Sequence, residues 1–212
     1  MAVFFPDFRS RHILPLGACA LCAVLALLPA SPARGQQQEI TLEAASSDFD
    51  RPNERLVFQE IRVQQGDIVI SADQAESRDL DFSRGSWLFQ GNVRITGPMG
   101  EIESARATVS FTDHRLGRAT AEGTPATFRR ILPEPENRTV TGSAERVIYD
   151  LTRGELELAG RATLRDGLRE VSGGRLVYRI AEDRLIASTD EEGADRVRII
   201  ITPPEDDEDD AP

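Results

Sequence analysis

Few side chains in this sequence are suited to nucleophilic or metal chemistry. The chain has two Cys, Cys19 and Cys22, and two His, His12 and His114. Structural and catalytic zinc sites need several Cys or His ligands, and a Cys nucleophile needs a basic partner. Both kinds of site are therefore excluded almost completely. His114 is the one imidazole beyond the N-terminal region, and it lies in the segment 112–115 (TDHR), which is typical of a turn. We expect it to be a solvated turn residue.

Carboxylates are the remaining candidates for catalysis, and they are abundant. A glycosidase needs only a pair of them at a suitable separation. With 36 Asp and Glu in the chain, the sequence neither rejects such a pair nor singles one out. No EF-hand pattern is present. We therefore expect no enzymatic activity, no metal and no cofactor.

The charged residues are unusual in kind and in balance. The formal net charge is −11, and all 25 cationic side chains are Arg, with no Lys. Nucleic-acid binding needs a cationic surface, so nucleic acid is not an expected partner. Arg is well suited to phosphate because its guanidinium binds in a bidentate manner. Arg62, Arg94, Arg129 and Arg130 occupy expected strand positions and are candidates for lipid phosphates; the alternative is that they are solvated face residues.

The N-terminal 35 residues are typical of a secretory signal peptide. Arg9 and Arg11 precede a run from Ile13 to Leu28 without charge, and small residues and Pro follow. Cleavage is expected after Ala33 or Gly35. The competing interpretation is an uncleaved membrane anchor, which needs roughly 20 apolar residues. Removal of residues 1–35 would leave a chain without Cys.

The rest of the chain, from 39 to 202, alternates between apolar and polar residues. Alternation with a period of two residues indicates strands with one buried and one solvent-exposed face. One apolar row consists of Trp87, Phe89, Val93 and Ile95. A second consists of Leu156, Leu158, Ala162 and Leu164. Turn signals rich in Gly and Asp separate about a dozen expected short strands. The pattern predicts an all-β fold.

The alternation changes phase inside some strands. Ile102 is even-numbered, whereas Ala107 and Val109 are odd-numbered, and a similar change separates Phe58 from Ile61. Such a change is typical of a β-bulge, which bends and twists a sheet. A curved sheet is therefore expected.

A degenerate repeat runs through this region. Gly91, Gly123 and Gly160 occur in related strand motifs, and a second motif follows each of them after a turn. A period of this length predicts stacked supersecondary units that share one core.

The residues expected to face the interior share the buried side of their strands. They are candidates for binding lipid acyl chains, or they form the dry core of a two-layer fold. The set is Phe58, Ile70, Trp87, Phe89, Ile95, Val109, Phe111, Phe128, Tyr149, Leu158, Leu164 and Tyr178. If this face lines a solvent-open trough, Phe111→Asp should abolish lipid binding and leave the protein folded, because the carboxylate would stay hydrated.

Five motifs carry a resemblance to a known family. They are the segments 89–95 (FQGNVRI), 123–128 (GTPATF), 140–149 (VTGSAERVIY), 158–164 (LAGRATL) and 171–178 (VSGGRLVY). Together with the signal peptide, they resemble the LptA family of periplasmic lipopolysaccharide-transport proteins, of the OstA-like superfamily, over roughly residues 40–202. The complete absence of Lys and the acidic run 205–210 depart from that pattern.

The resemblance implies an open, twisted antiparallel β-jelly roll at residues 36–202. The two Pro and six acidic residues that follow predict a disordered, self-repelling tail at 203–212. It implies a periplasmic carrier that binds the acyl chains of lipopolysaccharide and stacks head to tail between the two membranes. Its implied partners are lipopolysaccharide, an inner-membrane LptC-like component and an outer-membrane LptD-like component. The edge strands expected to mediate stacking, through unpaired backbone groups, contain Ile40, Leu42, Val197, Ile199 and Ile201.

Two alternatives remain open from the sequence. An LptC-like protein would have the same fold and keep its N-terminal segment as a membrane anchor. A structural or glycan-binding β-solenoid would instead form a closed, right-handed coil. Concentration-dependent self-association is expected for the open-edged fold.

Overall fold

The computed structural model describes residues 39–78, 82–132, 137–189 and 196–203, which all belong to one compact unit, Gln36–Pro212. The expected signal peptide and the acidic run 205–210 lie outside the described residues. Twelve β-strands occur in the described part of the chain. They are β1 (Ile40–Glu43), β2 (Ser46–Asp50), β3 (Arg55–Gln65), β4 (Ile68–Ser77), β5 (Arg84–Gly97), β6 (Gly100–Thr112), β7 (Arg115–Leu132), β8 (Arg138–Asp150), β9 (Glu155–Asp166), β10 (Arg169–Arg179), β11 (Arg184–Ser188) and β12 (Arg198–Ile201).

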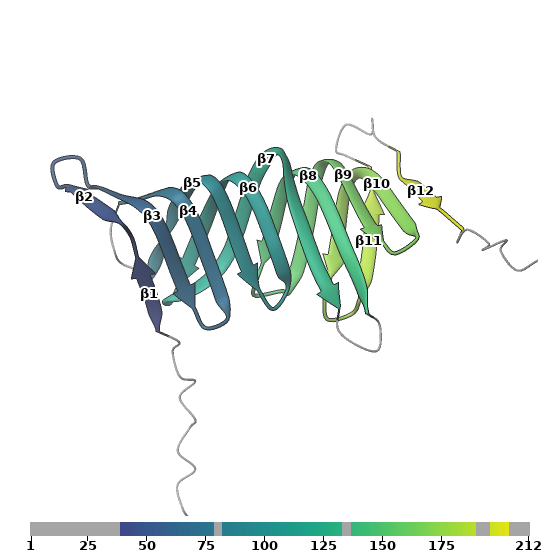
Figure 1. Cartoon of the computed structure of the whole chain (residues 1–212), viewed down its shortest axis with the longest axis horizontal. Coiled ribbons are helices and arrows are strands. Elements are labelled where there is room, and N and C mark those ends of the chain that lie inside the picture. The colour runs from purple at the N-terminus through teal and green to yellow at the C-terminus, as the bar shows by residue number, and fades with distance from the viewer. Residues whose placement is uncertain (1–38, 79–81, 133–136, 190–195, 204–212) are drawn as a thin grey trace, which may run out of the picture. The chain divides into compact units, whose positions relative to one another are not determined.

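All twelve strands belong to one sheet, in the order β1-β3-β4-β5-β6-β7-β8-β9-β10-β11, with β2 also on β3 and β12 also on β10 (Figure 1). Each of the long strands pairs antiparallel with the next one in the sequence. The predicted all-β, open antiparallel fold is thus confirmed. The coil of a β-solenoid is not formed by these strands, since their pairing is that of an antiparallel meander.

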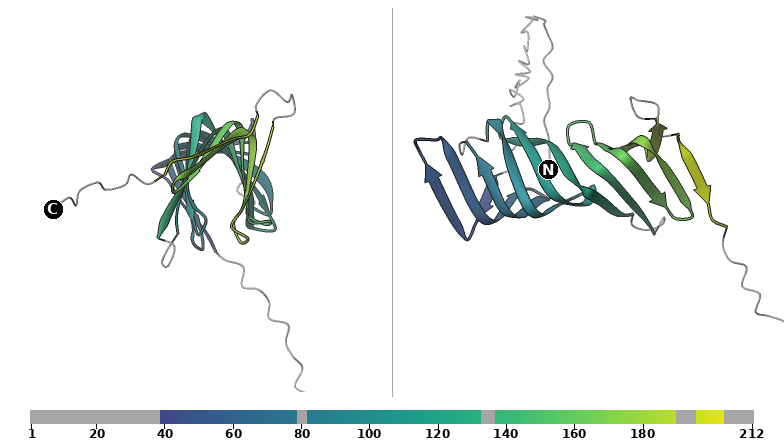
Figure 2. Two further views of the ribbon diagram at one scale, coloured as in Figure 1. Left: turned by 90° about the vertical axis from the view of Figure 1, so that its right-hand side faces the viewer. Right: turned by 90° about the horizontal axis from the view of Figure 1, so that it is seen from above.

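The long strands bend near their midpoints, so that the sheet forms an arch with two walls (Figure 2). The bend coincides with irregular register in each successive pair from β4–β5 to β9–β10. The shifts lie between Ser71/Gln74, Gln90/Val93, Glu103/Arg106, Glu122/Ala126, Ser143/Arg146 and Gly173/Arg175. We call this line of bulges the ridge. The phase change predicted between Ile102 and Ala107 is one of them.

Gly160 shows why the ridge needs glycine. Gly160 and Arg161 both have positive φ, +78° and +47°. A Cβ atom on Gly160 would lie 2.7 Å from Oε2 of Glu145 on the neighbouring strand. Arg161 Nε donates to Oε1 of the same Glu145 at 2.8 Å. The bulge therefore brings a carboxylate over the glycine and binds it with the next side chain.

The same arrangement recurs earlier in the chain, as the repeat predicted. Gly91 and Asn92 have positive φ, +73° and +46°. A Cβ atom on Gly91 would clash with Asp73 of β4, and Asn92 Nδ2 donates to Asp73 Oδ2 at 2.8 Å. Gly123, the third predicted anchor, also lies at a register shift. Because each bulge lets a strand continue, the strands are longer than predicted, up to 18 residues in β7.

The two walls are named by the turns on their free rims. Wall A carries the turns 113–114, 151–154 and 180–183, and wall B carries the turns 66–67, 98–99 and 167–168. The mouth is the side between the two rims, opposite the ridge. At each end of the sheet two short strands replace one long strand. β2 and β11 extend wall A, and β1 and β12 extend wall B.

Candidate functional site: the interior of the arch

The outward faces of both walls are polar and carry cross-strand ion pairs. Arg94 contacts Glu101 at 3.0 Å and Glu103 at 2.5 Å. Arg175 binds Glu157 through two nitrogens, at 2.7 and 2.8 Å, and this contact holds the pKa of Glu157 below its usual value. These side chains are partly exposed, so each pair contributes little stability. Many Arg residues are therefore face residues, as the alternative interpretation predicted.

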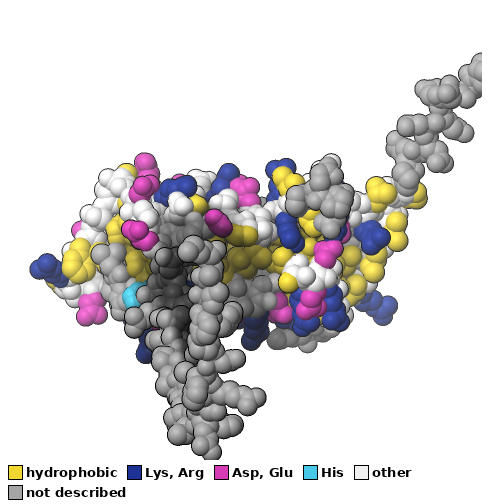
Figure 3. Space-filling view, turned by 90° about the horizontal axis from the view of Figure 1, so that it is seen from below, with side chains coloured by type: hydrophobic (Ala, Val, Ile, Leu, Met, Phe, Trp, Pro, Cys, Tyr) yellow, Lys and Arg dark blue, Asp and Glu magenta, His cyan; other side chains and the backbone are white. Residues whose placement is uncertain are grey.

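The inward faces form a continuous apolar interior from β3 to β10. All twelve residues predicted to face the interior lie there, with exposed fractions between 0% and 8%. They belong to one cluster of buried side chains. Seen from the mouth side, hydrophobic side chains are visible between charged ones (Figure 3). Whether these residues bind lipid stays a prediction.

The interior changes in character along the sheet. Its N-terminal half on wall A is aromatic: Trp87 stacks on Phe58 at 5.5 Å and on Phe82 at 4.9 Å between ring centroids. Phe111 meets Phe82 edge to face at 4.9 Å. The C-terminal half is mainly aliphatic, with Leu156, Leu158, Leu164 and Leu176 beside two tyrosines, Tyr149 and Tyr178.

This aliphatic half ends in a cavity of about 750 Å³, which we call the C-terminal cavity. Its volume is within the range of roughly 300–1,000 Å³ that is typical of ligand pockets. Apolar side chains line much of it, with charged residues and a phenol beside them. The lining residues are Arg138, Val140, Leu164, Asp166, Gly167, Leu168, Arg169, Val171, Tyr178, Asp183, Leu185 and Ile199.

A buried glutamine joins the two rims near the N-terminal end. Gln65, on wall B, is 7% exposed. Its Nε2 donates to the His114 carbonyl at 2.6 Å, and its Oε1 accepts from the Leu116 N–H at 2.9 Å; both partners are at the 113–114 turn of wall A. This contact closes the mouth beside the aromatic cluster.

A charged network joins the rims near the C-terminal end. Arg138, at the start of β8, donates to Asp166 on its own wall and to Asp183 at the rim of wall A. Tyr178 donates to Asp183 at 2.6 Å and accepts from Arg130 at 3.1 Å. Burial, and then the bond to Asp183, raise the pKa of Tyr178 to about 12. The bond from Tyr178, and then the charge of Arg138, hold the pKa of Asp183 below its ordinary value.

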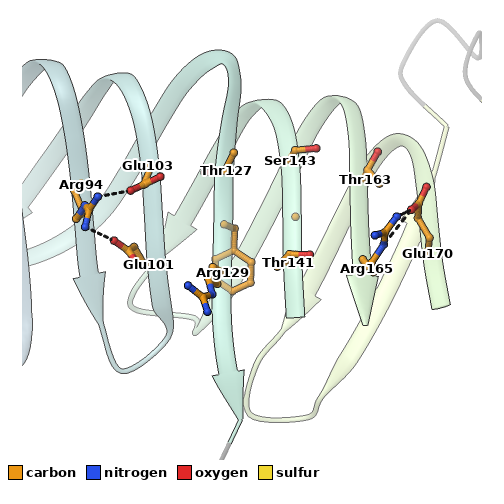
Figure 4. A pocket seen from close by; sticks show the side chains of 12 residues that line it. Arg94, Glu101, Glu103, Thr127, Arg129, Thr141, Ser143, Thr163, Arg165 and Glu170 are labelled. Atoms are coloured by element: carbon orange, nitrogen blue, oxygen red, sulfur yellow. Dashed lines mark hydrogen bonds and ion pairs between the residues drawn. The ribbon is translucent and has the colours of Figure 1, made fainter. Parts of the chain in front are cut away.

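The four Arg candidates for lipid phosphate are placed differently by the structure. Arg62 and Arg129 are exposed, and Arg94 is bound to glutamates on the outward face. Figure 4 shows Arg129 in a polar hollow of this face, between the Arg94 cluster and the pair Arg165–Glu170. Arg130 alone of the four contacts a side chain across the interior.

Phe111 faces the apolar interior, as predicted, at a place that is closed to solvent. It is 3% exposed and packs against Phe82 at a closed part of the mouth. A carboxylate at this position would lose its hydration, so Phe111→Asp should destabilise the fold itself. The substitution therefore tests the fold together with lipid binding, and a contact between Phe111 and lipid stays a prediction.

The predicted edge residues lie on short terminal strands or beside them. Ile40 and Leu42 are in β1, Ile199 and Ile201 are in β12, and Val197 directly precedes β12. Ile199 and Ile201 are 63% and 66% exposed. The sequence missed β2 and β11 as parts of these edges. Their role in assembly stays a prediction.

His114 lies in the expected turn, is exposed and has positive φ, +58°. No group of three or more His, Cys, Asp or Glu within the described ranges is arranged to hold a metal ion. Within those same residues, no helix is long and apolar enough to cross a membrane.

Sequence reasoning named Arg130 as a candidate without assigning its face, and it did not single out Arg138 or Gln65. Arg130 follows Phe128 by two positions, and Arg138 precedes Val140 by two, so both have the parity of buried residues. Gln65 has the parity of Val63 in the same way. The alternation therefore contained the signal that these polar groups face inward.

An arched antiparallel meander with an apolar interior and two exposed edges defines this protein as an open β-jelly-roll of the OstA-like class. Residues 74–184, more than half of the chain, match the family model described as LptA/(LptD N-terminal domain) LPS transport protein. The chain belongs to this family.

Relatives of known function are similar over much of their length. The lipopolysaccharide export system protein LptA of Escherichia coli (strain K12) is 24% identical over 132 residues, which are 61% of this chain and 69% of the relative. LptA of Haemophilus influenzae is 26% identical over 132 residues, 61% of this chain and 74% of that protein. Among solved structures, LptH, the LptA homologous periplasmic component from Pseudomonas aeruginosa, is 16% identical. It matches with a TM-score of 0.44 over 78% of this chain and 96% of that chain.

Proposed function

We propose that this protein is a periplasmic carrier that moves lipopolysaccharide from the inner to the outer membrane, with the acyl chains in the interior of the arch. The observation that carries this proposal is the apolar interior, which is continuous from β3 to β10 and reaches a cavity at its C-terminal end. Membership of an LPS transport family supports it. Acyl chains would displace contacts between the two walls, and the apolar side chains would replace water around them.

Assembly with neighbouring proteins would use the two ends of the sheet. A terminal strand exposes unpaired backbone groups that another strand can pair with. The C-terminal end also exposes apolar side chains, Ile199, Ile201 and Ile186, at 63%, 66% and 37%. A second copy, an LptC-like component or an LptD-like component is the partner that the family suggests.

Photo-crosslinking tests the interior directly. p-Azidophenylalanine in place of Phe128, which is 2% exposed, should crosslink to lipopolysaccharide on irradiation. The same residue in place of Arg129, the next position on β7 and on the outward face, is the matched control and should not crosslink. Equal crosslinking at both positions, or none at position 128 in a folded protein, would reject the interior as the binding site.

The N-terminus of the exported protein distinguishes the carrier from its anchored alternative. A mature chain that begins near Gln36, measured by intact mass, is expected for the carrier. Retention of Met1 would favour the LptC-like alternative.

A further inference from the structure

Two cationic side chains occupy inward-facing positions of wall B. Arg130 lies between Phe128 and Leu132, which are 2% and 5% exposed, in the inward row of β7. Arg138 has the same relation to Val140, 1% exposed, in β8. Charged side chains seldom face a core without a partner. The groups that these Arg side chains contact therefore indicate which chemical groups the two positions bind.

The partners of both Arg residues come in part from the opposite wall. Asp183 accepts from Arg138 and from Tyr178, and Tyr178 also accepts from Arg130 at 3.1 Å. Asp183 has 51% of its side chain exposed, whereas Arg138 has 26%. The carboxylate is thus the more accessible member of the pair, and both side chains line the C-terminal cavity.

The network borders the C-terminal cavity. Arg138, Asp166, Tyr178 and Asp183 all line that cavity, together with Arg169 and aliphatic side chains. The cavity and its network contain three guanidinium groups, of Arg130, Arg138 and Arg169, and two carboxylates, of Asp166 and Asp183. This local excess of positive charge occurs in a chain whose net charge is −11. An apolar cavity with a cationic rim matches an amphiphile that has an anionic headgroup.

We propose that Arg138 and Asp183 form a latch across the mouth, which opens when a phosphate of the bound lipid replaces Asp183 on Arg138. The inference rests on the proposed function and deepens it, because it assigns the headgroup to one end of the interior. A phosphate carries more charge than a carboxylate and offers three acceptor oxygens, so it competes well for a guanidinium. Release of Asp183 frees the rim of wall A, and the acyl chains enter the cavity beside it.

The outward hollow of wall B is a less suitable phosphate site. Arg94 and Arg165 there are each bound to glutamate, at 2.5 Å to Glu103 and at 2.5 Å to Glu170. The hollow is lined mostly by Thr, Ser and charged side chains, as Figure 4 shows. Phe128 is the one large apolar residue in its lining, whereas several aliphatic side chains, among them Val140, Leu164 and Leu185, line the C-terminal cavity.

The test measures the affinity of the full-length exported protein for two lipids. One is hexa-acylated lipid A with two phosphates, and the other is the same lipid after removal of both phosphates. Arg138→Gln should weaken binding of the phosphorylated lipid by about tenfold or more, since a charge-assisted bond is lost, and should leave the dephosphorylated lipid unaffected. Asp183→Asn should strengthen binding of the phosphorylated lipid, because the competing carboxylate is gone.

Matched variants separate the latch from a structural role. Arg165→Gln removes a similar Arg–carboxylate pair on the outward face and should change neither affinity. Arg138→Lys keeps the charge without the bidentate fork, so it should retain part of the preference for phosphate. Circular dichroism and melting temperature check the fold of every variant, and Asp183→Asn tests the exchange even if Arg138→Gln does not fold.

The outcomes are distinct for the two levels of the proposal. If the wild type binds neither lipid, the carrier function itself fails. If it binds both equally and Arg138→Gln changes nothing, the carrier stands and the latch is wrong. The latch is equally wrong if Asp183→Asn weakens binding of phosphorylated lipid as much as Arg138→Gln does.

Discussion

Replacement of Gln65 by Leu tests whether polar contacts across the mouth hold the walls together. Leucine has a similar size but cannot make the hydrogen bonds of the Gln65 amide, which include those to the His114 carbonyl and from the Leu116 N–H. Each such bond contributes about 1 kcal/mol net, and a buried group left without a partner costs about 1–3 kcal/mol. We expect the free energy of unfolding to fall by about 2–4 kcal/mol, which corresponds to about 5–15 °C in melting temperature for a chain of this size.

Gln64→Leu provides the matched control. Gln64 is exposed, and its amide donates to the Gly66 carbonyl within the same turn at 3.2 Å. Its replacement should change stability by no more than about 0.5 kcal/mol. Urea titration followed through Trp87, the single Trp and 1% exposed, measures both variants. Hydrogen exchange at the Leu116 amide reports the local contact and should quicken in Gln65→Leu alone.

Equal stability of the two variants would refute the reasoning, because it would mean that the buried bonds across the mouth contribute no more than an exposed one. If Gln65→Leu loses stability while hydrogen exchange at the Leu116 amide is unchanged, the loss does not come from the contact between Gln65 and the rim of wall A. If the walls must part for lipid to enter, Gln65→Leu should also load lipid faster than Gln64→Leu.

Three further predictions concern the ridge, the C-terminal network and the edge. Gly160→Ala should lower the free energy of unfolding by about 1–3 kcal/mol more than Gly154→Ala, measured by urea titration, because a Cβ at position 160 meets Glu145 at 2.7 Å whereas position 154, also at positive φ, has nothing within 4 Å. The pKa of Tyr178 is raised from 10.0 to about 12 in the folded state, so the stability that its protonated form contributes is complete below pH 10 and should be lost as the pH rises from 10 to 12. The melting temperature of Tyr178→Phe should not show this fall between pH 10 and 12. The same dependence of melting temperature on pH in both proteins would contradict the assignment. Wild-type protein should self-associate with rising concentration in sedimentation experiments, and Ile199→Lys with Ile201→Lys should shift it toward monomer with unchanged circular dichroism, since both side chains are mostly exposed; an unaltered profile would argue against β12 as an interface.

The sequence alone determined the all-β fold and the buried face of the apolar residues on its long strands. Alternation placed Trp87, Phe89, Val93 and Ile95 on one buried row, and all four are at most 3% exposed. The row keeps its parity across the bulge, where three steps from Gln90 to Val93 on β5 lie opposite two steps on β6. Changes of phase and recurring glycines also predicted where the sheet bends. These features are local, since they depend on the backbone conformation of a few neighbouring residues.

The family was accessible from sequence for the same reason. The motifs around Gly91, Gly123 and Gly160 encode strand and bulge together, and they recur in order. The split terminal strands were predicted only in part. β2 and β11 are short, and β2 has no buried residue, so neither has the periodicity that marks a strand packed on a core.

Tertiary structure decided which polar side chains meet across the mouth. Gln65 and His114 are 49 residues apart, and Arg138 and Asp183 are 45 apart. Parity predicts the face of a residue, but it does not say which residue stands opposite on the other wall. The distance between two side chains on opposite walls depends on the bend at the ridge, on the register of every strand between them, and on the length of the Arg side chain. Alternation already places Arg129 and Arg130 on opposite faces of their strand, but only the fold shows that Arg130 reaches Tyr178 on the other wall.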